Sequence, residues 1–264
     1  MTAVHWLIQE NQADLDTVRD IPTLLAAEGH VAHLVRLERG AEAPIPPDLP
    51  EQGPLVCHGP GFMTRAVGHP ILSKGLFFDP ASFRWSAFRV GWGEAMLSRD
   101  GQVVDLATAL RVLDGSERAF VRPDADSKAF EGGVYDHAGL LSAVGRDGID
   151  QATPVVVAAA LEIEAEWRFF VVASEIAACS EYRRWGRPST EGFVPHAAIE
   201  IAADLATRWQ PADIYCLDLA SAEGRFGIVE ANCFNASRFY AADRARILSA
   251  VNQDVLARHP FDRA

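Results

Sequence analysis

The chain has 264 residues, of which 49% are hydrophobic and 23% charged, the composition of an ordinary globular protein. Its net charge of −12 argues against general binding to nucleic acid, because binding to phosphates needs a basic surface. No apolar run approaches the roughly 20 residues that span a bilayer, and the N-terminus carries no basic segment ahead of an apolar one, so we expect a cytoplasmic protein with neither membrane nor nucleic-acid partners.

Strands and a helix alternate in the first third of the chain. A strand is predicted at Val4–Gln9, a helix at 14–29 and a second strand at 31–38. The proline-rich segment 40–54 predicts a connecting loop, and a short buried strand follows at 55–59. Strand, helix and strand in this order predict a small parallel α/β domain over residues 1–84.

A second domain is predicted over residues 85–264, where the elements are of a different kind. Residues 117–136 predict two short strands joined by a polar turn, and 137–148 a helix. Residues 153–185 predict three successive strands, and an amphipathic helix follows at 195–209 with Pro195 near its start. A hairpin is predicted at 213–232 and a last helix at 240–258.

The predicted hairpin carries three oxygen-bearing side chains. A five-residue turn centred on Glu223 would place position 218 opposite 228 and 216 opposite 230, so that Asp218, Glu230 and Asn232 share one face. A shift of one residue would separate them. Two carboxylates and an amide oxygen are ligands that Mg²⁺ accepts alongside substrate phosphates. A solvated polar hairpin face is the alternative, and both interpretations remain open here.

Two cations lie on either side of a predicted turn. Arg122 ends the apolar strand "AFVR", and Lys128 follows the turn "PDADS". A guanidinium and an ammonium both suit phosphate oxygens, although either residue is equally compatible with a surface role. Lys128 is one of only two lysines in a chain whose positive charge comes almost wholly from arginine.

Further charged residues occur on the predicted strands of 153–185. Glu166 and Arg168 share a strand face, where they either pair across adjacent strands or orient a phosphate contact. The segment "SEYRRWGRP" holds three arginines, which suit either a basic surface loop or an acidic substrate: Arg183, Arg184 and Arg187. No phosphate-loop, dinucleotide-binding, nucleophile-elbow or zinc motif is present, and the four cysteines are far apart.

In their order, these stretches resemble the ATP-grasp superfamily, in particular the clade whose first phosphate ligand is an arginine. The resemblance covers about residues 118 to 242 through "FVRPDADSKAF", "EWRFFVV", "SEYR" and "YCLDLASAEGRFGIVEANCFNASRFY". It implies an ATP-grasp fold of two α+β subdomains that grip ATP, preceded by the small α/β pre-domain. Two features depart from the family pattern: "PDADS" has no glycine, and "CFNAS" follows Asn232 where relatives tend to have a proline.

The resemblance also implies a role for each residue. Phosphates of ATP would be bound by Arg122 and Lys128, with Glu166 orienting the contact, and adenine by the stretch that includes Val157, Ala158 and Glu162. Arg168 would reach the γ-phosphate or an acyl-phosphate. Arg168 and Arg183 are the predicted catalytic residues, the latter because the arginines of "SEYRRWGRP" suit an anionic substrate. The Mg²⁺ ligands would be Asp218, Glu230 and Asn232.

Family enzymes activate a carboxylate as an acyl-phosphate that an amine then attacks. A carboxylate–amine ligase with small-molecule or peptide substrates is therefore expected. The alternatives are a phosphotransferase and a non-catalytic nucleotide-binding module. The sequence does not indicate an oligomeric state.

Overall fold

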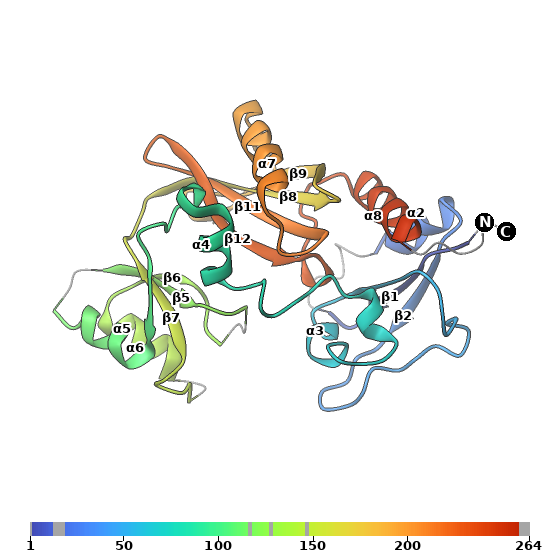
Figure 1. Ribbon diagram of the computed structural model, residues 1–264, viewed down its shortest axis with the longest axis horizontal. Helices are drawn as coiled ribbons and strands as arrows, with labels where there is room; N and C mark the ends of the chain where they lie inside the picture. The colour runs from blue at the N-terminus through green and yellow to red at the C-terminus, as the bar shows by residue number, and fades with distance from the viewer. Residues whose placement is uncertain (1, 13–18, 116–117, 127–128, 146–147, 259–264) are drawn as a thin grey trace.

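The computed structural model describes residues 2–12, 19–115, 118–126, 129–145 and 148–258, which form a mixed α/β structure with one parallel and two antiparallel sheets (Figure 1). Within these ranges no helix is long and apolar enough to cross a membrane. The predicted turn lysine, Lys128, and the first part of the predicted helix 14–29 lie outside the described residues.

The N-terminal unit contains the predicted parallel strands. Its three parallel strands lie in the order β2-β1-β3, and the helix α2 crosses between β1 and β2. Gly29, just beyond α2, has a φ of +81°, a conformation that glycine adopts without strain and that ends helices. The bounds are β1 His5–Gln9, α2 Ile21–Ala27, β2 Val31–Val35, β3 Leu55–His58, α3 Phe62–Arg65 and the 3₁₀ turn η1 Leu72–Gly75.

A five-stranded antiparallel sheet is the centre of the molecule, in the order β10-β9-β8-β11-β12. Helices α4 and α7 cover one face, and α8 together with the N-terminal unit covers part of the other (Figure 1). The bounds are α4 Trp85–Trp92, η2 Gly93–Ala95, β8 Ile163–Val172, β9 Glu175–Arg184, β10 Arg187–Pro188, α7 His196–Arg208, β11 Ile214–Ala222, β12 Arg225–Cys233, η3 Phe234–Ala236 and α8 Arg244–Arg258.

A four-stranded antiparallel sheet forms a separate lobe, in the order β4-β7-β5-β6, packed on α5 and α6 (Figure 1). The bounds are β4 Gln102–Asp105, α5 Leu106–Leu113, β5 Ala119–Pro123, β6 Gly133–Tyr135, α6 His137–Gly145 and β7 Pro154–Ala158. The three successive strands predicted over 153–185 are therefore present as β7, β8 and β9, but they belong to two different sheets. The chain passes from one lobe to the other between Ala158 and Ile163.

The face of the large sheet that α8 partly covers changes from apolar to polar along its strands. On this face Phe170 of β8 is paired with Cys216 of β11, and both are buried against the N-terminal unit. Two residues further along each strand, Arg168 is paired with Asp218. Since alternate residues of a strand share a face, one side of the sheet supplies both the core and a polar site beside it.

Candidate active site

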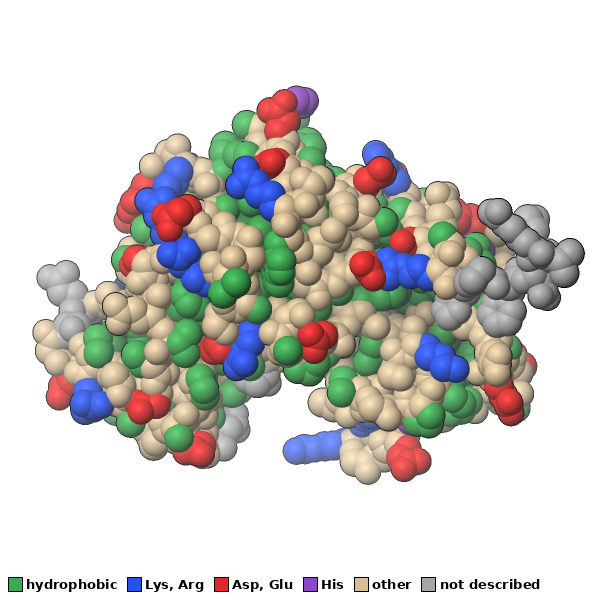
Figure 2. Space-filling view, viewed as in Figure 1, with side chains coloured by type: hydrophobic (Ala, Val, Ile, Leu, Met, Phe, Trp, Pro, Cys, Tyr) green, Lys and Arg blue, Asp and Glu red, His purple; other side chains and the backbone are tan. Residues whose placement is uncertain are grey.

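A cleft of about 510 Å³ lies between the four-stranded lobe and the polar end of the large sheet. Strands β5 and β6 line one wall, and strands β8, β9, β11 and β12 the other. Figure 2 shows that the surface is hollowed between the four-stranded lobe and the N-terminal unit, beside the large sheet. A volume of this size is in the range of small-molecule binding sites. The cleft brings together Arg122, Glu166, Arg168, Arg183, Asp218 and Glu230.

The predicted hairpin forms β11 and β12, but its turn and register differ from the prediction. The turn is a tight one at Glu223 and Gly224, which have φ of +52° and +75°. Such a turn alone would pair position 218 with 229 and direct Glu230 to the opposite face. A β-bulge leaves Val229 unpaired, so that Asp218 is opposite Glu230 and Cys216 opposite Asn232. The predicted pairs 218/228 and 216/230 are therefore wrong, whereas the shared face is confirmed.

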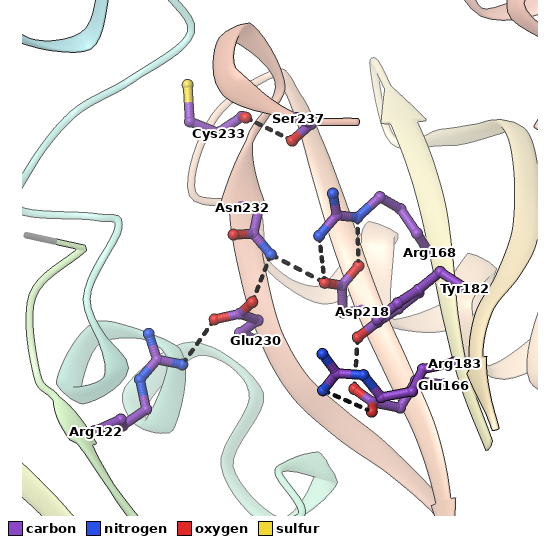
Figure 3. Close-up of polar contacts among 10 residues, drawn as sticks. All are labelled: Arg122, Glu166, Arg168, Tyr182, Arg183, Asp218, Glu230, Asn232, Cys233 and Ser237. Atoms are coloured by element: carbon purple, nitrogen blue, oxygen red, sulfur yellow. Dashed lines mark hydrogen bonds and ion pairs between the residues drawn. The ribbon is translucent and has the colours of Figure 1, made fainter. Parts of the chain in front are cut away.

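Asp218 and Arg168 form a bidentate ion pair at the centre of the cleft (Figure 3). Arg168 donates from Nε to Oδ1 at 2.8 Å and from Nη2 to Oδ2 at 2.6 Å. Burial raises the pKa of the Asp218 carboxyl, and the paired guanidinium opposes that effect. Burial alone would lower the pKa of Arg168, but the Asp218 carboxylate raises it well above its ordinary value. Each charge therefore depends on the other while both are excluded from water.

Asn232 links Asp218 to the next ion pair. Its amide donates to Asp218 Oδ2 at 3.0 Å and to Glu230 Oε1 at 2.9 Å. Glu230 Oε2 in turn accepts a hydrogen bond from Arg122 Nη1 of the opposite wall at 3.1 Å. Asn232 thus links the other two predicted metal ligands, and the predicted phosphate ligand Arg122 joins Glu230 to β5 across the cleft (Figure 3).

Glu166 is a second buried carboxylate on the same wall. Its Oε2 accepts a hydrogen bond from the Tyr182 hydroxyl at 2.6 Å, and its Oε1 one from Arg183 Nη1 at 3.3 Å. Burial, together with the nearby Asp218 and Glu166 carboxylates, raises the pKa of Tyr182 well above its ordinary value. Arg183 is 45% exposed and therefore able to turn toward a ligand in the cleft.

A pair of tyrosines forms the end of this wall. The rings of Tyr182 and Tyr240 are stacked with centroids 5.1 Å apart. The Arg168 guanidinium carbon lies 5.6 Å from the Tyr182 ring centroid and 5.2 Å from that of Tyr240. Neither tyrosine was expected in the site from the sequence, although Tyr182 occurs in the "SEYR" stretch and Tyr240 ends the stretch "CFNASRFY".

Among the residues that the structure describes, no three His, Cys, Asp or Glu side chains are grouped so as to hold a metal ion by themselves. The candidate set contains only two carboxylates, Asp218 and Glu230, with the amide of Asn232. These are hard oxygen donors, and a metal that also binds phosphates and water needs few protein ligands. The donor chemistry therefore fits Mg²⁺ held jointly with a nucleotide.

The predicted adenine segment 157–162 comprises the end of β7 and the connection from the four-stranded lobe to the large sheet. Val157 packs on the α5–α6 side, Ala158 is buried and paired with Phe120, and Glu162 is exposed. A small apolar cavity beside the cleft is lined by their neighbours Ala159 and Leu161, together with Leu97, Phe120, Ile228 and Val229. The sequence did not predict that residues of β12 and of the segment before β4 would line this cavity.

Cys233, at the end of β12, is 2% exposed, and burial raises the pKa of its thiol. Its backbone carbonyl accepts a hydrogen bond from Ser237 at 2.7 Å. The hydrogen bond holds the chain as it leaves β12, and the raised pKa makes the Cys233 thiol a poor nucleophile.

A protein-family model matches residues 98–250, more than half of the chain, and its description is ATP-grasp domain, family 2 of the R-2-K clade. No curated protein sequence is significantly similar to this chain.

Solved structures share the fold at low sequence identity. The RimK domain protein ATP-grasp from Sphaerobacter thermophilus has a TM-score of 0.63 and 13% identity, covering 96% of this chain and 100% of its own. D-alanine–D-alanine ligase from Bacillus anthracis has a TM-score of 0.59 and 10% identity, covering 98% and 99%. A RiPP-associated ATP-grasp ligase from Chryseobacterium gregarium, in complex with ADP and a leader and core peptide, has a TM-score of 0.56 and 12% identity, covering 99% of both chains.

Proposed function

The chain belongs to family 2 of the R-2-K clade of ATP-grasp domains, and on that premise we propose that it is an ATP- and Mg²⁺-dependent carboxylate–amine ligase. One observation carries the proposal. Arg122 of one lobe meets Glu230, Asn232 and Asp218 of the other across a cleft that also holds Arg168 and Arg183. Phosphoryl transfer depends mainly on positioning and charge neutralisation, and this set of residues supplies both.

The cleft and its neighbouring cavity offer separate places for the parts of ATP. In our proposal the adenine ring occupies the apolar cavity beside Ala159 and Leu161, and the backbone of residues 157–162 supplies its hydrogen bonds. The triphosphate extends into the cleft toward Arg122. Lys128, which lies outside the described residues, remains a proposed second phosphate ligand because it follows Arg122 by six positions.

The charges of the cleft favour a cation that enters with the nucleotide. Among its described lining residues there are three arginines and five carboxylates, the latter being Asp126, Glu131, Glu166, Asp218 and Glu230. A triphosphate brings further negative charge into this acidic surrounding, which is unfavourable unless a metal ion accompanies it. Asp218, Glu230 and Asn232 would hold Mg²⁺, which would neutralise the phosphate oxygens during transfer.

In our proposal, the arginines on the β8–β9 wall bind the carboxylate substrate. Arg168 and Arg183 carry their charge beside the position that the transferred phosphoryl group would reach, so they would stabilise an acyl-phosphate and the carboxylate from which it forms. The amine would attack that acyl-phosphate and release phosphate. The Chryseobacterium relative was solved with a peptide, so we include peptides among the proposed substrates alongside small molecules.

The proposal is tested by incubating the protein with ATP, Mg²⁺ and pools of carboxylates and amines. We expect ADP and free phosphate to appear together with a condensed product, and Glu230→Gln to lower this turnover by about a hundredfold or more. Glu223→Gln is the matched control, since Glu223 is exposed at the turn of the same hairpin, outside the cleft. A stable phosphorylated product would indicate a phosphotransferase. ATP binding without turnover of any carboxylate would exclude the ligase.

A further inference from the structure

The ion pair between Arg168 and Asp218 uses the same atoms that the proposed metal site needs. Arg168 occupies both Asp218 oxygens, at 2.8 and 2.6 Å, and Asn232 donates to one of them at 3.0 Å. The Asp218 residue is only 1% exposed. These three hydrogen bonds use three of the roughly four lone-pair positions of the carboxylate, so a metal ion that binds through Asp218 competes directly with Arg168.

We propose that Arg168 is a displaceable counter-ion of Asp218, and that the guanidinium and a divalent cation bind this carboxylate in exchange. The inference rests on the proposed function, because it concerns the same site. In the absence of metal, the buried carboxylate needs a cation, and Arg168 provides one. With a divalent cation at Asp218, the nearby guanidinium is repelled at short range in a site with little water.

The surroundings of Arg168 give the displaced guanidinium a place to go. The stacked rings of Tyr182 and Tyr240 already lie beside it, at 5.6 and 5.2 Å from its central carbon. An aromatic face holds a guanidinium without using its hydrogen-bond donors. Tyr240 has a φ of +50°, uncommon for a bulky residue, which fits a ring that is kept in one position by its neighbours. The freed donors of Arg168 then face the anions in the cleft.

The exchange makes metal and nucleotide binding depend on each other. A metal ion alone has to displace Arg168 without offering the guanidinium a new anion. A metal ion that arrives with a triphosphate offers one, so the two ligands bind more tightly together than separately. Arg168 thereby restricts metal binding at Asp218 to the state in which a phosphate is present.

The first test measures Mn²⁺ affinity without nucleotide, by electron paramagnetic resonance, in the wild type and two variants. Arg168→Gln removes the competitor and is expected to tighten Mn²⁺ binding by about tenfold or more, equivalent to about 1.4 kcal/mol. Arg183→Gln is the matched control, because it removes the same charge from the same wall but contacts Glu166 and not Asp218. It is expected to change the affinity by about threefold or less, since a half-exposed charge is screened. Equal effects of the two variants, or weaker binding to Arg168→Gln, overturn the exchange.

The second test uses the wild type and does not depend on the stability of a variant. The Arg168 Nε–H, which donates to Asp218, should give a protected arginine side-chain signal in a proton–nitrogen correlation spectrum, identified by its loss in Arg168→Lys. Adding Mg²⁺ with a non-hydrolysable ATP analogue should shift or broaden this signal, whereas Mg²⁺ alone should not. Calorimetric binding of the analogue with Mg²⁺ and an unchanged signal would refute the exchange and leave the proposed function standing. No binding of the analogue would refute both.

Discussion

His58 makes the stability of this protein depend on pH. It lies at the end of β3, is 1% exposed, and neither ring nitrogen has a side-chain partner among the described residues. Its ring stacks on Phe239 at 5.2 Å and meets Phe234 edge-on at 5.7 Å. Burial lowers the pKa of His58 from 6.5 to about 4. In the unfolded chain the ring therefore gains a proton at a higher pH than in the folded protein.

The sign and size of the effect follow from these two values. Above pH 6.5 the ring is neutral in both states and its contribution to stability is fully present; as the pH falls toward 4, only the unfolded state takes up the proton, and that contribution is lost. A difference of about 2.5 in pKa, at about 1.36 kcal/mol for each unit, gives a total loss of about 3 kcal/mol. About 2 kcal/mol of it should be lost between about pH 7 and pH 4.5.

The measurement is urea unfolding at both pH values in the wild type and in His58→Phe, which keeps an aromatic ring between Phe234 and Phe239 but cannot take up a proton. Other groups also titrate over this range, so the informative quantity is the difference between the two proteins in stability lost. His196→Gln is the control, because His196 is largely exposed on α7. If the wild type and His58→Phe lose the same stability, the ring is not held neutral in the core and the reasoning fails.

Three further predictions concern packing and the nucleotide site. Asn235→Ala should lower the free energy of unfolding by about 2–4 kcal/mol in urea titrations, because the amide donates to the carbonyls of Cys57 and Gly75 and accepts from the Phe77 N–H; a loss below about 0.5 kcal/mol would mean that water replaces these bonds. Gly91→Ala should cost about 1–3 kcal/mol in thermal unfolding, since its Cβ would lie 2.3 Å from the Trp209 ring. Gly145→Ala, whose Cβ would meet nothing within 4 Å, serves as its control, and equal effects would contradict the packing argument. Ala159→Phe should weaken ATP binding in calorimetry by about tenfold while changing stability by less than about 0.5 kcal/mol, because Ala159 is exposed beside the apolar cavity; unchanged affinity would place adenine elsewhere.

The sequence predicted most strands of the fold but missed the strands β4 and β10 and the helices α3, α4 and α5. β4 and α5 were not expected, although Asp105 caps α5 by accepting from the Thr108 N–H at 2.6 Å, which is a local signal. Gly91 lies within α4 and Gly93 directly follows it, so the segment gives a weak helical pattern. Its stability comes from Phe88 and Trp92, which pack against Trp209 far along the chain. Such tertiary packing cannot be read from local propensity.

The sequence predicted that the three proposed metal ligands share a face because they are an even number of positions apart. It did not predict their strand register correctly. Asp218, Glu230 and Asn232 are at even spacing, so any register with even offset gives them one face. The two-residue turn at Glu223 and Gly224 imposes an odd offset, and only the unpaired Val229 restores the even one. Within the segment "GRFGIVEAN" only Gly227, an isolated glycine inside the strand, indicates a bulge or a close backbone approach, and it does not identify position 229. The predicted shared face is therefore correct, although the five-residue turn from which it was inferred is wrong.

The pairing of the cations is the part of the site that no local pattern contains. Arg168 and Asp218 are 50 positions apart and become neighbours only because β8 pairs with β11. The sequence left two roles open for Glu166 and Arg168: pairing across strands, or contact with phosphate. The structure has the first arrangement, with Arg168 on Asp218 and Arg183 on Glu166. The two roles are compatible if they are successive, because a carboxylate that must stay buried before a metal ion arrives needs the same guanidinium that a phosphate needs afterwards.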